Sequence, residues 1–168
     1  MNQDELITFC VDVREVLGNM TKKDHYWRSS FGQSNFPVGC CGDTSKLLAY
    51  LLYQQFGIVS ELVSGHYNDF DHSSPACGLS NGNSHAWLVV NGWIVDLTAD
   101  QFNDRGYNLP PVLITLDTRF HDLFANRDSS LQLSQSNERT LVDELIKTAS
   151  HVQQRLRERG WFCGSSSF

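Results

Sequence analysis

The segment 84–98, Ser-His-Ala-Trp-Leu-Val-Val-Asn-Gly-Trp-Ile-Val-Asp-Leu-Thr, restricts the fold more than any other part of the chain. Two runs of β-forming residues flank Asn91-Gly92, and this dipeptide is the strongest short signal for a two-residue hairpin turn. With that turn, Val90 pairs with Trp93. The sequence therefore predicts two antiparallel strands whose register is set by the turn.

The predicted register places polar chemistry on one face of the hairpin. Counting outward from the turn, Trp87 pairs with Asp96 and His85 pairs with Thr98. These four residues share a face, and Asp96 is diagonal to His85, at a Cα separation of roughly 7–8 Å that longer side chains can bridge. A carboxylate beside an imidazole is the arrangement in which an aspartate orients a catalytic histidine. The opposite face is expected to contact the core through Ala86, Leu88, Val90 and Val95.

A second stretch, 36–52, brings two cysteines to the start of an apolar helix that we expect to end at Gly57. The N-terminus of a helix presents unpaired N–H groups and a partial positive charge, which lower the pKa of a nearby thiol. A cysteine at this place is a candidate nucleophile. The alternative is that Cys40 and Cys41 are both small core residues. Helical periodicity places each of them over apolar residues, so it does not distinguish the two.

The chain resembles the transglutaminase-like branch of the papain-fold cysteine enzymes. Three pieces in chain order carry the resemblance: Gly39-Cys40-Cys41-Gly42-Asp43-Thr44-Ser45, His85-Ala86-Trp87 and Asp96-Leu97-Thr98. Members typically show Gly-x-Cys, an aspartate two residues later and a small residue two beyond it, which Gly39, Cys41, Asp43 and Ser45 match. The resemblance, which covers about residues 36–100, selects Cys41 as nucleophile, His85 as base and Asp96 as its partner. Leu97 stands where proline is common.

The resemblance implies an α+β fold with a papain-like or transglutaminase-like core, in which the nucleophile helix packs on a small antiparallel β-sheet, with N- and C-terminal helices. It implies a cysteine hydrolase that cleaves an amide, peptide or thioester bond through an acyl-enzyme. The substrate would be a peptide or protein that carries an amide. Two alternatives are an acyltransferase or deamidase of protein glutamine, and a non-catalytic peptide-binding module. Gln33 is the expected side-chain donor of the oxyanion hole, with Trp27 second, and Cys40 and Trp87 are weaker candidates for substrate contact.

The remaining pattern completes a single domain over residues 1–168, with its core at about 36–120. We expect a helix at 4–17, strands at 58–64 and 112–116, an exposed polar connector at 126–137, a helix at about 137–159 and a flexible tail at 160–168. The C-terminal helix is expected to bury one stripe, formed by Leu141, Leu145, Ile146 and Val152. Trp161, Phe162 and Cys163 are expected to pack back on the domain.

The segment 65–84 is predicted to be a long loop near the mouth of the site. It carries side chains of metal-ligand type, but no paired Cys-x-x-Cys, so we expect neither a metal nor a cofactor. A metal-dependent hydrolase built on His66, His72 and Cys77 is a third alternative. His121 is predicted to be a surface or packing histidine, because no hairpin aspartate is expected beside it.

Charge and cysteine content restrict partners and compartment. The net charge of −6 argues against nucleic-acid binding, which needs a basic patch. No apolar run of about 18 residues occurs, so no membrane span is expected. The N-terminus is acidic, unlike a secretory signal. An odd number of cysteines, five, two of them adjacent, favours a reducing compartment, and the cytoplasm is the predicted location. No oligomeric state is predicted.

Overall fold

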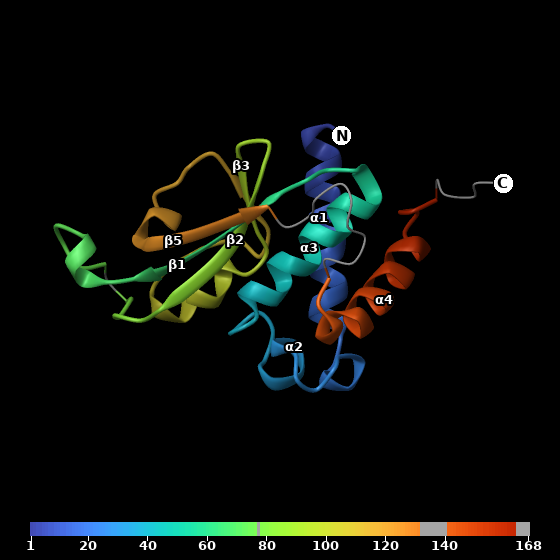
Figure 1. Cartoon of the computed structure of the whole chain (residues 1–168), viewed down its shortest axis with the longest axis horizontal. Helices are drawn as coiled ribbons and strands as arrows, with labels where there is room; N and C mark the ends of the chain where they lie inside the picture. The colour runs from blue at the N-terminus through green and yellow to red at the C-terminus, as the bar shows by residue number, and fades with distance from the viewer. Residues whose placement is uncertain (77, 132–140, 164–168) are drawn as a thin grey trace.

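The computed structural model describes residues 1–76, 78–131 and 141–163, which form a group of helices beside an antiparallel sheet (Figure 1). The helices are α1 (Gln3–Asn19), α2 (Ser30–Gln33), α3 (Cys41–Phe56) and α4 (Asp143–Glu158). The strands are β1 (Glu61–Tyr67), β2 (Ser84–Val90), β3 (Trp93–Asp96), β4 (Leu113–Thr115) and β5 (Phe124–Leu131). All four strand pairings are antiparallel, in the order β4-β3-β2-β1-β5. The predicted α+β class is confirmed.

The β2–β3 hairpin has the register that the turn predicts. Val90 pairs with Trp93, and Leu88 pairs with Val95 two residues further out. Asn91 and Gly92 both have positive φ, 49° and 83°, as a type I′ turn requires. The local dipeptide therefore decides which side chains of the two strands lie opposite one another.

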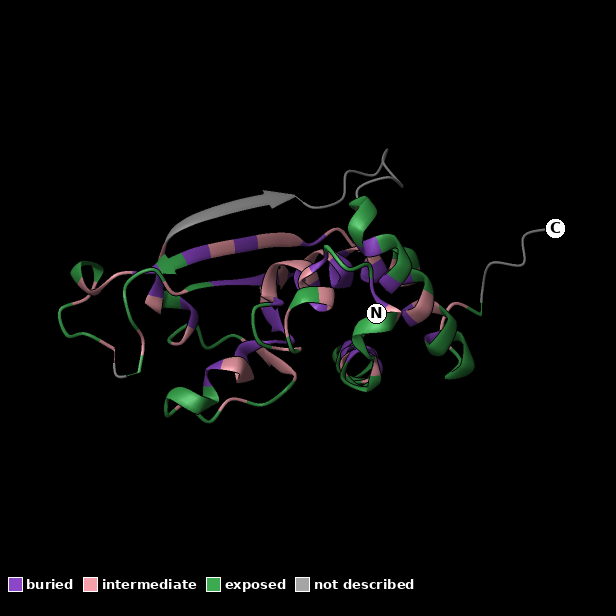
Figure 2. Cartoon of the chain, turned by 90° about the horizontal axis from the view of Figure 1, so that it is seen from below, coloured by how far each residue is buried: buried purple, intermediate pink, exposed green. Residues whose placement is uncertain are grey.

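Helix α3 lies at the centre of the main core. It begins at Cys41, as predicted, and ends where Gly57 adopts the left-handed conformation with φ of 66°. Helix α3 packs against β2 and α4, and its leucines share one buried cluster with side chains of α1. Leu88, Val90 and Val95 enter the same cluster from the sheet. Figure 2 shows the buried residues gathered between the sheet and the helices, with exposed residues along the outer loops.

The opposite face of the hairpin is also covered. A second apolar cluster is formed by Val63, Tyr67, Trp87, Ile94, Phe102 and Phe124. Two 3₁₀ helices contribute to it: η3 (Ala99–Arg105) supplies Phe102, and η4 (His121–Leu123) adds Leu123 at its margin. The face that carries His85 and Asp96 is therefore an enclosed layer, in which charged groups are poorly solvated.

Several predicted boundaries are wrong. β1 runs from Glu61 to Tyr67 instead of 58–64, and the loop after it includes the 3₁₀ helix η2 (Asp69–Asp71). The part of the polar connector at 126–131 belongs to β5, which pairs with β1 and makes β1 an interior strand; residues 132–137 lie outside the described residues. Polar composition indicated a loop there, but the backbone hydrogen bonds that form a strand do not depend on apolar side chains.

The C-terminal segment departs from the prediction in two ways. Leu145 and Val152 of α4 are buried, but Ile146 is 51% exposed. The flexible tail does not begin at residue 160 as predicted. The expected packing of Trp161 on the domain is confirmed, because Trp161 donates from Nε1 to Asp12 at 2.7 Å and packs edge-on against a ring of α1. Cys163 is exposed, and residues 137–140 and 164–168 lie outside the described residues. None of the described helices is both long and apolar enough to cross a membrane.

Gly65 allows β5 to pair closely with β1. A Cβ at Gly65 would lie 2.6 Å from the carbonyl oxygen of Phe124 and 3.0 Å from that of Ala125. Because both contacts are backbone, we expect Gly65→Ala to lower the free energy of unfolding by roughly 2–4 kcal/mol in urea titration. Gly18→Ala is the matched control, since a Cβ there meets nothing within 4 Å and helix propensity favours alanine by up to about 1 kcal/mol. Equal effects of the two substitutions would contradict the close approach of β5.

Candidate active site

Cys41 is the first residue of α3, and its thiol is half-buried. It is hydrogen-bonded to the side chain of His85 and to the backbone N–H of Ala86. The first turn of α3 adds the unpaired N–H groups of a helix N-terminus. Cys41 thus lies where a thiolate is stabilised by two hydrogen-bond donors and a helix dipole.

His85 lies at the start of β2 and is 1% exposed. Its Nε2 donates to Oδ2 of Asp96 at 2.6 Å, so the contact with Cys41 falls to the other ring nitrogen, Nδ1. Neighbouring rings enclose the imidazole at centroid distances of 5.2–6.0 Å: Trp87, Phe102, Phe120, His121 and Phe124. This packing holds the ring in one orientation between Cys41 and Asp96.

Asp96 ends β3 and accepts hydrogen bonds on both oxygens. Oδ1 accepts from the backbone N–H of Thr98 at 2.9 Å and from its hydroxyl at 3.3 Å. Oδ2 accepts from His85 and, at 2.8 Å, from Nε2 of His121. Burial alone would raise the pKa of this carboxyl, but the charge of His85 and the hydrogen bonds from His121 and His85 hold the pKa well below its ordinary value. Asp96 is therefore a buried carboxylate.

The ionisation of the two reacting groups follows from these contacts. Burial alone would lower the pKa of His85, but the charge and hydrogen bond of Asp96, with a smaller contribution from Cys41, raise it to about 9. Burial alone would raise the pKa of Cys41, but its hydrogen bond to His85 and the charge on that ring lower it. Both shifts are in the direction that favours a thiolate–imidazolium pair.

The two adjacent cysteines differ sharply. Cys40 is fully buried, and its thiol donates to the carbonyl of Val38 at 3.5 Å. Burial raises the pKa of Cys40 to about 11, so this thiol stays protonated, whereas the pKa of Cys41 is lowered. The structure therefore distinguishes two residues that helical periodicity left equivalent, and it encloses Cys40, a weaker candidate for substrate contact, in the core.

The other predicted contact residues lie differently from the expectation. Gln33 ends α2 and is exposed, and no hydrogen bond among the described residues joins its side chain to the triad. Trp27 is 62% exposed and stacks under the guanidinium of Arg28 at 4.8 Å. Trp87 is 2% exposed and packs behind His85, away from solvent. The first turn of α3 is bonded to the start of α2, because Asp43 accepts from both the backbone N–H and the hydroxyl of Ser30.

Two residues of the site were missed. His121 was expected to have no hairpin aspartate beside it; that prediction is wrong, because the fold brings it to Asp96 from η4. Gln101, in η3, lies 3.5 Å from Nδ1 of His85 through its Nε2. No local signal indicates His121, which is 25 residues from Asp96 in sequence. Gln101 comes shortly after the hairpin in sequence, and that closeness is the one signal that could have indicated its place in the site.

His85, Asp96 and His121 are also a group of metal-ligand type, with ligand atoms within 4.8 Å of one another. Zinc ligands about 2.0–2.1 Å from a tetrahedral ion are about 3.3 Å apart. Here the two nitrogens hydrogen-bond to the carboxylate directly, at 2.6 and 2.8 Å, so a metal would have to separate them.

His66 and His72, which were considered as ligands of a metal-dependent hydrolase, are not arranged as a metal site. His66 is exposed, and Nε2 of His72 hydrogen-bonds to the carbonyl of Leu123 at 3.0 Å while its ring stacks on Tyr67. Cys77 lies outside the described residues.

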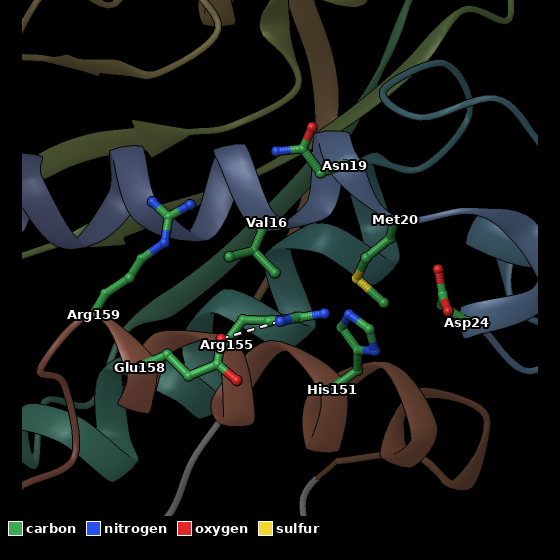
Figure 3. A pocket seen from close by; sticks show the side chains of 8 residues that line it. All are labelled: Val16, Asn19, Met20, Asp24, His151, Arg155, Glu158 and Arg159. Atoms are coloured by element: carbon green, nitrogen blue, oxygen red, sulfur yellow. Dashed lines mark hydrogen bonds and ion pairs between the residues drawn. The ribbon is translucent and has the colours of Figure 1, made fainter.

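A pocket of about 420 Å³ lies away from the triad, between α1 and α4 (Figure 3). Its lining side chains carry both signs of charge, and Arg155 and Glu158 pair across 3.1 Å. The residues that line it are Val16, Asn19, Met20, Asp24, His151, Arg155, Glu158 and Arg159.

Comparison of the chain with protein-family models, with curated proteins and with solved structures finds no match.

Proposed function

We propose that the protein is a cysteine hydrolase of papain-like, transglutaminase-like architecture that cleaves an amide, peptide or thioester bond with Cys41, His85 and Asp96. The observation that carries the proposal is the continuous set of contacts from the Cys41 thiol through His85 to the buried carboxylate of Asp96. The opposite pKa shifts of Cys40 and Cys41 support it, since the thiolate and not the thiol is the nucleophile.

In the proposed mechanism, the Cys41 thiolate attacks the carbonyl carbon of the substrate and forms a carbon–sulfur bond. The proposed donor to the resulting oxyanion is the backbone N–H of Cys41, at the N-terminus of α3. The imidazolium of His85 gives its Nδ1 proton to the leaving amine or thiol as that bond breaks. His85 then takes a proton from water, which attacks the thioester, releases the acid and restores the thiolate, while Asp96 keeps the ring oriented and stabilises its charge.

Acyl transfer to an amine and deamidation of protein glutamine use the same first step and remain the alternatives within this class. Hydrolysis is preferred because water needs no second binding pocket. A non-catalytic peptide-binding module has no use for a buried carboxylate that raises the pKa of His85. Four cysteines, Cys10, Cys40, Cys41 and Cys163, are free among the described residues, and we propose a reducing compartment, the cytoplasm, as the location.

The experiment that tests the proposal traps the acyl-enzyme with an activated ester, p-nitrophenyl acetate. We expect a burst of p-nitrophenol stoichiometric with protein and an acetyl group mapped to Cys41 by peptide mass spectrometry after acid quench. Cys41→Ala should lose both, because it removes the thiol whose pKa His85 lowers. Cys40→Ala is the matched control and should keep both. Acetylation spread over lysines, with no burst and no Cys41 adduct, would reject covalent catalysis at this site.

A further inference from the structure

One side chain outside the triad contacts His85 and the segments next to Cys41 and Asp96. Gln101, in η3, accepts from the backbone N–H of Gly39 at 3.3 Å through Oε1. Its Nε2 donates to the carbonyl of Thr98 at 2.9 Å and lies 3.5 Å from Nδ1 of His85. A single half-buried amide therefore touches the loop before the nucleophile, the base, and the segment after Asp96.

The orientation of this amide follows from its partners. The backbone N–H of Gly39 can only donate and therefore faces Oε1, whereas the carbonyl of Thr98 can only accept and therefore faces Nε2. These two partners place Nε2 on the Nδ1 side of His85, which is the side that meets Cys41. At 3.5 Å the approach to the ring is too long for a strong hydrogen bond, so Gln101 acts on His85 by setting its spacing.

Both backbone partners of Gln101 lead directly to the triad. Gly39 is two residues before Cys41 and has a φ of 69°, in the left-handed region that favours glycine. Thr98 donates two hydrogen bonds to Asp96. Gln101 thus connects two segments, the short loop before the nucleophile and the turn that holds the carboxylate.

A second bridge supports the same two segments from behind. Arg14 of α1 donates to both oxygens of Asp100, at 3.1 and 2.7 Å, and to the carbonyl of Leu97. Its guanidinium also lies 4.5 Å from the ring centre of Phe36, in the loop before Cys41. Because this bridge holds Leu97 and Asp100, which both lie just before Gln101, the start of η3 that carries the amide is fixed in place.

We propose that Gln101 is a positioning residue, which holds the Cys41 loop and His85 at the separation that permits the thiolate–imidazolium pair. The inference rests on the proposed function. Among the described residues, the titratable groups that face the Cys41–His85 pair are Asp96 from β3, His121 from η4 and the adjacent thiol of Cys40. Gln101 carries no charge, so an uncharged replacement that shifts the ionisation of Cys41 does so through geometry.

The test measures the alkylation rate of Cys41 by iodoacetamide from pH 5 to 9, resolved by peptide mass spectrometry. Gln101→Ala and Gln101→Met are compared with the wild type, and the methionine variant keeps the side-chain length without the hydrogen bonds. We expect both variants to be alkylated more slowly at pH 6, by up to about ten-fold, and at nearly the wild-type rate at pH 9, as a rise of one unit in the pKa of Cys41 permits. Gln154→Ala, on the exposed face of α4, is the control and should match the wild type.

The outcomes separate this inference from the proposed function. If the wild type reacts rapidly at pH 6 and both Gln101 variants do the same, the positioning role is wrong and the proposed function stands. If Gln101→Met retains the wild-type profile while Gln101→Ala does not, the side chain only fills space, which also overturns the inference. If the wild-type Cys41 reacts no faster at pH 6 than the exposed Cys163, Cys41 and His85 form no ion pair. That result would contradict both the positioning role of Gln101 and the proposed function. Equal urea midpoints of the variants exclude a loss of fold as the cause.

Discussion

Iodoacetamide at pH 6 will alkylate Cys41 of the native protein, and His85→Ala will slow that reaction roughly thirty-fold. A thiol with a pKa of about 8.5 is about 0.3% ionised at pH 6, so lowering its pKa can raise the thiolate fraction there by up to about 300-fold. Part of this gain is lost because a thiolate of lower pKa is a weaker nucleophile, with a Brønsted slope of about 0.4–0.5. Without His85, burial is the largest remaining influence on Cys41 and raises its pKa.

The control for this prediction is the neighbouring thiol. Cys40→Ala should leave the pH profile of Cys41 unchanged, because Cys40 is buried and its pKa is raised to about 11. The measurement is the rate of carbamidomethylation of each cysteine-containing peptide across the pH range. A wild-type profile for Cys41 with its midpoint near pH 8.5, identical to that of His85→Ala, would show that the pair does not form in the free protein.

Asp96→Asn will have the second large effect, a loss of about 3 kcal/mol in the free energy of unfolding at pH 6. Four donors from three residues converge on the two oxygens of this buried carboxylate: His85, His121 and Thr98. An asparagine keeps one oxygen and turns an N–H group toward donors that already point at it, so donors are left without an acceptor. The imidazolium of His85 also loses its buried counter-charge.

The loss will depend on pH with a sign set by the two pKa shifts. The pKa of His85 is raised to about 9 in the folded state, so its stabilising contribution is complete below about 6.5 and is lost as the pH rises through about 9. The pKa of Asp96 is lowered, so its contribution is present above about 3.9 and is lost as the pH falls. The difference between wild type and Asp96→Asn should therefore be greatest between about pH 4 and 6.5.

Urea titrations at pH 4, 6 and 9 check this prediction. Asp104→Asn is the control, because the side chain of Asp104 is 75% exposed and its removal should change stability by less than about 0.5 kcal/mol. Equal losses for Asp96→Asn at pH 6 and pH 9 would mean that the carboxylate does not support a charged His85.

Local chemistry accounts for the elements that the sequence predicted well. The Asn91-Gly92 turn requires positive φ at both residues, and that geometry alone sets the β2–β3 register and puts Asp96 beside His85. The start of α3 at Cys41 and its end at Gly57 follow in the same way from helix-terminal preferences. The strand at 126–131 was not recognised, because its pairing with β1 is a long-range property of the backbone.

By itself, then, the sequence determined the α3 helix, the hairpin and the diagonal of His85 and Asp96, all of which depend on neighbours within a few residues. The tertiary structure decided which cysteine meets the histidine, since burial encloses Cys40 and turns Cys41 toward His85. It also decided that His121 and Gln101 join the site, through contacts with residues 25 and 16 positions away. Burial and contacts between distant segments arise only when the layers pack, and no local pattern encodes them.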